Sequence, residues 1–164
     1  VQTGNGRTGS LYAYMQYGFT PDIMSTAKRL GGGLPIGACL MGEKVQDTMG
    51  AGTHGSTFGG NPAVCAGALN ILSRIDGNLL ADVKAKGEYI VKELSGAPGV
   101  KGISGKGLMI GIETEKSAGD VLAECMANGV LVLTAHGKVR LVPALNIPME
   151  LVEKAVAVIK AACA

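Results

Sequence analysis

One lysine, Lys28, lies between a short apolar run and three consecutive glycines. The run contains Ile23 and Met24 and predicts a buried strand, while Gly31 to Gly33 let the backbone turn sharply and approach another group closely. A lysine amine held in a pocket at the end of a strand can lose its proton and attack a carbonyl carbon to form a Schiff base. Taken alone, this stretch fits an ordinary solvated lysine better, so the reactive interpretation depends on the rest of the chain.

Two further segments combine polar groups with room for a ligand. The segment from Thr53 to Pro62 places hydroxyl groups beside glycines whose free backbone N–H groups suit an anion, although an ordinary loop has the same composition. Arg140 lies in an apolar run, where a guanidinium must find an acid partner or face outward. Its planar group suits a carboxylate held by two parallel bonds, and an exposed arginine on an edge strand is the open alternative.

Three glycines near the start, Gly4, Gly6 and Gly9, match the spacing Gly-x-Gly-x-x-Gly of dinucleotide-binding loops. That motif should follow a complete strand and should precede an acidic residue by roughly 20 positions. Here no strand is visible before the glycines, and Asp22 comes too early. A plain glycine-rich loop is therefore favoured, and a nucleotide-binding module is a minor alternative.

The composition argues against several classes of partner and site. The 164 residues carry a net charge of +2, the aromatic fraction is 4% and Trp is absent, so neither nucleic acid nor an anionic membrane is expected as a partner. No apolar run is long enough to span a bilayer, and no signal peptide is visible. The cysteines form no Cys-x-x-Cys pair, so no metal site is expected. They predict buried free thiols in a reducing cytoplasm, at Cys39, Cys65, Cys125 and Cys163.

The hydrophobic pattern predicts an α/β protein in two parts that meet at the break Asp76-Gly77-Asn78. In the first part we expect two buried strands, one before Lys28 and one over 34–41. Asn61 should cap a helix that Pro62 begins, with close packing on most sides. The second part should be a small sheet with helices on one face. We expect further helices over 10–18, 43–49, 79–94, 118–128 and 148–162, and strands over 100–104, 108–113, 130–134 and 139–143.

The order of these features resembles the class III, or subgroup II, pyridoxal-phosphate-dependent aminotransferases over essentially the whole chain. The resemblance implies that residues 1–76 form the rear of a fold type I cofactor-binding domain with a mostly parallel sheet. Residues 77–164 would form its small C-terminal α+β domain, so that the chain corresponds to the C-terminal half of such an enzyme. The matching motifs are Val1 to Gly9, Pro21 to Lys28, Gly31 to Ala38, Thr53 to Pro62 and Arg140 to Ile147.

The resemblance also implies roles for individual residues. Lys28 would form the Schiff base with pyridoxal 5'-phosphate and then shuttle a proton between the substrate α-carbon and the cofactor. Gln2 would hydrogen-bond near the phenolic oxygen of the cofactor, and Val1 would pack on the face of its ring. Thr57, together with Ser56, would reach the cofactor phosphate of the neighbouring subunit, which implies a homodimer.

Arg140 would bind the substrate α-carboxylate. Within the family, the motifs are most similar to members that transfer the terminal amino group of N-acetylornithine to 2-oxoglutarate in arginine biosynthesis. Ornithine, succinylornithine, succinyldiaminopimelate and 4-aminobutyrate are alternative substrates, and a non-catalytic structural fragment is a further alternative. The family's acid that pairs with the pyridine nitrogen precedes the Val-Gln pair and lies outside this chain, so we expect the 164 residues alone to be inactive.

Overall fold

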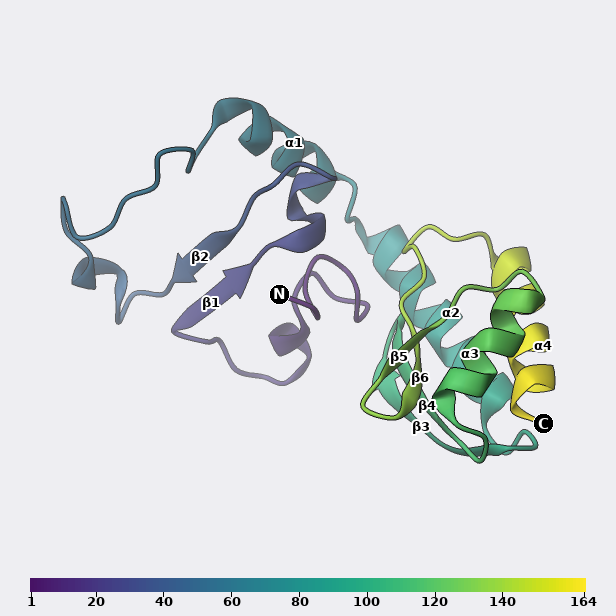
Figure 1. Cartoon of the computed structure of the whole chain (residues 1–164). Helices are drawn as coiled ribbons and strands as arrows, with labels where there is room; N and C mark the ends of the chain where they lie inside the picture. Colours follow the sequence, from purple (N-terminus) through teal and green to yellow (C-terminus); the bar gives the residue numbers. More distant parts are fainter.

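The computed structural model describes residues 1–164, which form two antiparallel sheets and four α-helices. Figure 1 shows β1, β2 and α1 on one side of the molecule, and the four-stranded sheet with α2, α3 and α4 on the other. None of the helices combines the length and the apolar character that a membrane crossing requires. The elements are, in chain order, a 3-10 helix Ala13–Gln16, β1 Ile23–Thr26, a 3-10 helix Lys28–Gly31, β2 Ala38–Met41, a 3-10 helix Gln46–Thr48, α1 Pro62–Ser73, α2 Gly77–Leu94, β3 Val100–Lys106, β4 Met109–Thr114, α3 Ala118–Ala127, β5 Leu133–Ala135, β6 Lys138–Leu141 and α4 Met149–Cys163.

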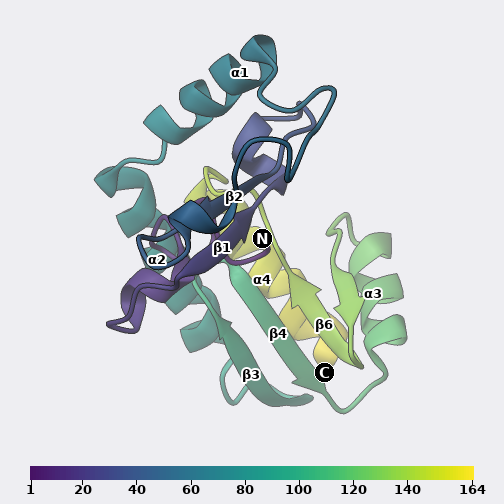
Figure 2. The same ribbon diagram turned by 90° about the vertical axis from the view of Figure 1, so that its left-hand side faces the viewer.

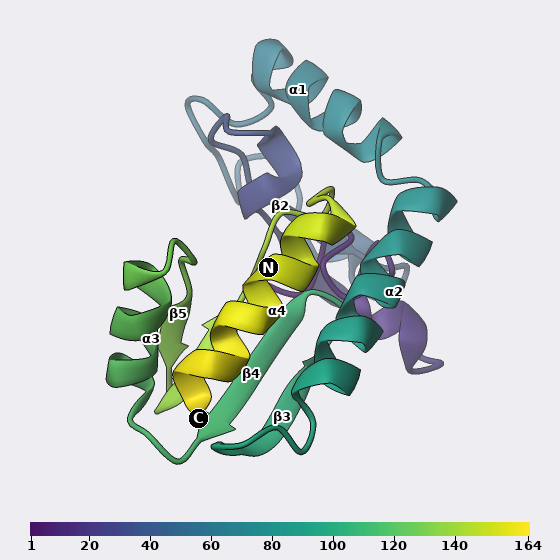
Figure 3. The same ribbon diagram turned by 90° about the vertical axis from the view of Figure 1, so that its right-hand side faces the viewer.

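The larger sheet has the strand order β3-β4-β6-β5, and all neighbouring strands are antiparallel. Alternate residues of β4 and β6 are buried, as a sheet with one covered face requires. Helices α2, α3 and α4 cover that face, with α4 between the other two (Figure 3), whereas Figure 2 shows the uncovered face. The expected small sheet with helices on one face is present, and its buried apolar core lies entirely between Val83 and Cys163.

Strands β1 and β2 form a separate two-stranded antiparallel sheet, in which Ile23 lies opposite Met41. The expectation that both strands are buried is wrong. Ile23 is 59% exposed, Leu40 is 43% exposed, and only Thr26 of the two strands is buried. The physical reason is that within residues 1–164 no third strand pairs with β1 or β2, and a two-stranded ribbon cannot cover its own faces. No parallel pair occurs among the strands of this chain.

Helix α1 begins where the sequence predicts. Oδ1 of Asn61 accepts a hydrogen bond from the backbone N–H of Ala63 at 3.0 Å, and Pro62 is the first helical residue. The expected close packing on most sides is wrong, because only Ala68 is buried and Leu69 is 69% exposed. Small apolar residues therefore indicate here a face that residues 1–164 leave largely uncovered.

The predicted helices near the start of the chain are shorter than expected. Ser10 caps no helix, because its hydroxyl donates to the backbone oxygen of Tyr12 at 2.8 Å. Only the 3-10 helix Ala13–Gln16 forms in that segment, and only Gln46–Thr48 forms in the segment 43–49. Local side-chain hydrogen bonds of this kind compete with helical ones.

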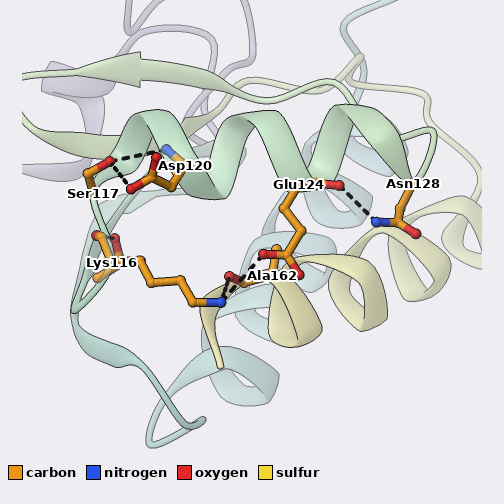
Figure 4. Close-up of polar contacts among 7 residues, drawn as sticks. Lys116, Ser117, Asp120, Glu124, Asn128 and Ala162 are labelled. Carbon is orange, nitrogen blue, oxygen red and sulfur yellow. Dashed lines mark hydrogen bonds and ion pairs between the residues drawn. The ribbon is translucent and has the colours of Figure 1, made fainter.

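Polar side chains fix the beginning of α3. The Ser117 hydroxyl accepts a hydrogen bond from the Asp120 N–H at 3.1 Å and donates to Oδ2 of Asp120 at 2.7 Å (Figure 4). Next to it, Nζ of Lys116 donates to the backbone oxygen of Ala162 at 3.1 Å and lies 3.4 Å from a carboxylate oxygen of Glu124. Lys116 thus joins the beginning of α3 to the end of α4, where a cation is favourable.

The break predicted around Asp76 is occupied by the start of α2. Oδ1 of Asp76 accepts a hydrogen bond from the Leu79 N–H at 2.8 Å, so this residue caps a helix that begins at Gly77. The chain between α1 and α2 is consequently short. The strand predicted over 130–134 begins only at Leu133.

The cysteines differ in burial, and none forms a disulfide. Cys125 and Cys163 are buried, as predicted, but Cys39 is exposed and Cys65 is intermediate, so the expectation of buried thiols is wrong for Cys39 and only partly right for Cys65. Cys39 lies on β2, which has no covering layer. Burial raises the pKa of the Cys125 and Cys163 thiols, which keeps both in the neutral form.

Candidate active site

Lys28 is the first residue of the 3-10 helix that follows β1, and its backbone has a φ of 58°. This left-handed conformation costs a residue other than Gly about 1–2 kcal/mol, so the surrounding structure must hold it. The side chain is exposed, and its Nζ takes part in no ion pair or side-chain hydrogen bond. The exposed amine is common to surface lysines, and it is the left-handed backbone that sets Lys28 apart from them.

The loop of residues 1–9 reaches the backbone next to Lys28. Asn5 is buried, and its Nδ2 donates a hydrogen bond to the backbone oxygen of Ala27 at 2.9 Å. The Leu30 N–H donates to the same oxygen at 3.3 Å. The peptide that enters Lys28 is therefore held from two sides.

The same loop reaches Arg140 on β6. An Nη2 N–H of Arg140 donates to Oε1 of Gln2 at 3.1 Å. Arg140 is half-buried on an inner strand, since β6 lies between β4 and β5, so the alternative of an exposed arginine on an edge strand is wrong. It forms no ion pair with an acid. Opposite it on β4 is Gly111, where an added Cβ would lie 3.4 Å from the Ser104 hydroxyl and 3.5 Å from the Lys138 side chain.

Gln2 and Arg140 line an open cleft of about 800 Å³ on the uncovered face of the large sheet. Lys106 and Lys138 also line the cleft, and no carboxylate does. Nζ of Lys138 lies 3.8 Å from Oε2 of Glu113, which is not one of the residues that line the cleft. The cleft is thus positively charged and suits a carboxylate, which a guanidinium can hold by two parallel bonds.

Arg7, in the same loop, is a buried residue whose structural role sequence reasoning missed. It is 2% exposed, and its Nη1 donates to the backbone oxygens of Leu108 at 2.9 Å and of Pro143 at 2.6 Å. The Leu108 N–H donates back to the Arg7 oxygen at 3.0 Å. Burial, with Arg29 and Arg140 as nearby like charges, lowers the pKa of Arg7 to about 10, so it stays protonated at neutral pH. The signal in the sequence was the position of Arg7 between glycines, because glycines let the backbone come close to other segments of the same chain.

The glycine spacing in the same loop does not make a nucleotide site. Only a four-residue 3-10 helix, Ala13–Gln16, follows the glycines, and a nucleotide-binding loop would open a longer helix. A Cβ added at Gly6 would lie 3.0 Å from Leu145, and one at Gly9 would lie 2.4 Å from Lys84. These glycines allow close contacts within the protein, and the nucleotide-binding alternative lacks the helix that it needs.

Three predicted residues remain, namely Val1, Ser56 and Thr57. Val1 lines a small cavity of about 160 Å³ together with Met24 and Ser25 of β1. Ser56 and Thr57 are exposed on the loop between β2 and α1, which extends away from the rest of the molecule in Figure 1. The structure thus joins Gln2 to Arg140 and Asn5 to the backbone beside Lys28, but no hydrogen bond links the hydroxyl of Ser56 or Thr57 to them.

The sequence was compared with known families and proteins. The family model for class-III aminotransferases matches residues 1–163. The acetylornithine aminotransferase of Haemophilus ducreyi is 48% identical over 161 residues, which cover 97% of this chain and 41% of that protein. The mitochondrial acetylornithine aminotransferase of Alnus glutinosa is 46% identical over 163 residues, covering 94% of this chain and 36% of that protein. The chain therefore spans about two-fifths of the length of these relatives.

Solved structures of aminotransferases have the same fold as this chain over nearly its whole length. The acetylornithine aminotransferase from Elizabethkingia anophelis matches with a TM-score of 0.90 at 32% identity, covering 99% of this chain and 44% of that one. An ornithine aminotransferase from Toxoplasma gondii matches with a TM-score of 0.90 at 35% identity, covering 99% and 41%. The prediction of a mixed α/β fold from a fold type I enzyme is confirmed. The chain belongs to the class-III aminotransferases.

Proposed function

We propose that this chain carries the reactive lysine of a pyridoxal-phosphate-dependent aminotransferase. In this proposal the whole protein transfers the terminal amino group of N-acetylornithine to 2-oxoglutarate, in arginine biosynthesis. The observation that carries the proposal is Lys28, whose strained backbone and unpaired amine lie at the end of β1. The substrate assignment is supported by relatives named acetylornithine aminotransferase at 48% and 46% identity.

The residues present fit pyridoxal phosphate. The Lys28 amine is free to bond to the aldehyde carbon, and Oγ1 of Thr26, two residues earlier, is buried without a hydrogen-bond partner. Arg29 and Arg140 lie close enough to Arg7 to lower its pKa, and this concentration of positive charge favours anionic groups such as a phosphate and carboxylates. When bound, the pyridine ring would supply an electron sink for amino-group transfer.

The chain's own residues would have the following roles. Lys28 would hold the cofactor and move the proton at the reacting carbon through its Nζ. Oε1 of Gln2 accepts a hydrogen bond from Arg140, which leaves the Gln2 amide N–H₂ to donate toward the phenolic oxygen. Arg140 would hold a substrate carboxylate by its second N–H pair. Val1 would pack against the ring.

Ser56 and Thr57 would serve a second subunit. Their loop extends away from the molecule and their side chains are exposed, as expected of groups that reach across a dimer interface. We therefore propose a homodimer in which these hydroxyls bind the partner's cofactor phosphate. We also propose that residues 1–76 belong to the cofactor-binding domain and residues 77–164 to a small C-terminal domain. We propose that the whole protein is located in the cytoplasm.

Ornithine is the second candidate substrate. An ornithine aminotransferase is among the solved structures with a TM-score of 0.90, so the fold does not separate the two substrates. Both carry a terminal primary amine and an α-carboxylate, and they differ at the α-amino group, which is acetylated in one of them. The other ω-amino substrates, succinylornithine, succinyldiaminopimelate and 4-aminobutyrate, are supported by the family alone.

The proposal is tested by reducing the purified chain with borohydride in the presence of pyridoxal phosphate and mapping the modified lysines by mass spectrometry. We expect modification concentrated at Lys28 and abolished there by Lys28→Ala. Lys101→Ala is the matched control, since Lys101 is exposed on β3 and forms no ion pair. Equal modification of Lys28 and Lys101 in the parent chain would contradict the assignment of Lys28.

A further inference from the structure

The backbone beside Lys28 is held by a residue far away in sequence. Asn5 is 2% exposed, and its Nδ2 donates to the backbone oxygen of Ala27 at 2.9 Å. Ala27 directly precedes Lys28, and no other side chain donates to the segment between β1 and the end of the following 3-10 helix. This hydrogen bond is therefore the only side-chain restraint on the peptide that enters the strained lysine.

The direction of a side chain depends on the peptide plane before it. The plane between Ala27 and Lys28 is set by ψ of the first residue and φ of the second. Lys28 has a φ of 58°, a conformation for which a lysine side chain has no preference of its own. A donor that fixes the Ala27 oxygen fixes this pair of torsion angles, and with it the direction in which the Lys28 side chain leaves the backbone.

We propose that Asn5 is a positioning residue, which aims the amine of Lys28 by holding the Ala27 carbonyl. The inference rests on the proposed function, because it assigns Asn5 a role toward the reactive lysine. The loop that carries Asn5 also carries Gln2, which contacts Arg140, so one short segment sets the lysine and the carboxylate-binding arginine relative to each other.

The residue type at position 5 suits this role. Asn5 itself has a φ of 53°, which Asn and Asp tolerate better than other side chains do. Aspartate at this position would keep the shape and the backbone preference but would place an acceptor oxygen against the Ala27 oxygen. Asn5→Asp therefore replaces the donor by a charged acceptor, while Asn5→Gly removes the side chain without adding a charge and keeps the backbone freedom, so a loss shared by both variants reports the missing donor.

Two measurements test the proposal, and each is made on the parent chain and on the variants Asn5→Asp and Asn5→Gly. The first is the rate at which pyridoxal phosphate is trapped by borohydride at Lys28, relative to Lys101 in the same sample. We expect this ratio to fall about tenfold in Asn5→Asp and several-fold in Asn5→Gly, the scale of one lost buried hydrogen bond. The second needs no cofactor and is the amide hydrogen exchange of Leu30, whose N–H shares the Ala27 oxygen.

Exchange at Leu30 should become about tenfold faster in Asn5→Asp, while exchange in α4 stays unchanged and shows that the chain is folded. Lowering the pH should reverse the effect in Asn5→Asp only, because a protonated carboxyl can donate to the Ala27 oxygen again. If neither the Lys28 ratio nor the Leu30 exchange changes in either variant, the role of Asn5 is overturned. Equal trapping at Lys28 and Lys101 in the parent chain would instead refute the proposed function, and the exchange measurement would still decide the role of Asn5.

Discussion

Replacement of Arg7 by Met removes a buried guanidinium that links distant parts of the chain. Nη1 of Arg7 donates to the oxygens of Leu108 and Pro143, which lie 101 and 136 residues further along the chain. Methionine has similar length and keeps the aliphatic packing, but it offers no donor. The substitution therefore tests the two hydrogen bonds rather than the volume of the side chain.

The size of the effect follows from the two carbonyls that lose their donor. An unpaired buried acceptor costs about 1–3 kcal/mol. The bond to Leu108 is buried, whereas the bond to Pro143 is partly buried and water can replace part of it. Removal of the charge relieves its desolvation and its repulsion by Arg29 and Arg140, the effects that lower the pKa of Arg7 to about 10. We therefore expect Arg7→Met to lower the free energy of unfolding by about 2 kcal/mol, because the two unpaired carbonyls contribute more than the relief of desolvation and repulsion.

Urea unfolding followed by circular dichroism measures this loss. With a slope of about 2 kcal/mol per M, the midpoint should fall by about 1 M in Arg7→Met. Arg74→Met is the matched control, because Arg74 is exposed after α1 and donates to no carbonyl through its side chain, so its midpoint should stay within about 0.25 M of the parent. A midpoint for Arg7→Met as high as that of Arg74→Met would refute the reasoning.

Two further predictions concern groups whose pKa the fold shifts. Lys160 donates a hydrogen bond to Glu93 at 2.7 Å, and this bond together with the lysine charge lowers the pKa of Glu93 below its ordinary 4.5. The pair therefore stabilises the folded state above pH 4.5, and its contribution is lost as the pH falls through the lowered pKa. Glu93→Gln should lower the melting temperature at neutral pH and leave it unchanged in strong acid, and an equal difference in melting temperature at both pH values would contradict the pairing. Cys125 and Cys163 are buried and burial raises their pKa, whereas Cys39 is exposed. At neutral pH, iodoacetamide should therefore alkylate Cys39 in the folded chain, and Cys125 and Cys163 only after unfolding. Equal alkylation rates for these three cysteines would show that the Cys125 and Cys163 thiols are accessible.

Local signals in the sequence determined several elements of this protein. Asn61 and Pro62 fixed the start of α1, because a cap and a first-turn proline act within a few residues. Period-two and helical patterns placed the second sheet and its helices, since these reflect one covered face. The glycines after Lys28 indicated unusual backbone geometry for the same local reason, and Lys28 has a φ of 58°.

Tertiary structure alone decided how the site is held together and which faces are covered. The exposure of Ile23 and Leu40 depends on whether other strands pair with β1 and β2, which an apolar run does not specify. The contact of Gln2 with Arg140 spans 138 residues. Asn5 contacts the backbone before Lys28 only because the first loop folds against β1. The sequence thus supplied the chemical groups, whose types are local, while their partners depend on which distant segments the fold brings within hydrogen-bond distance.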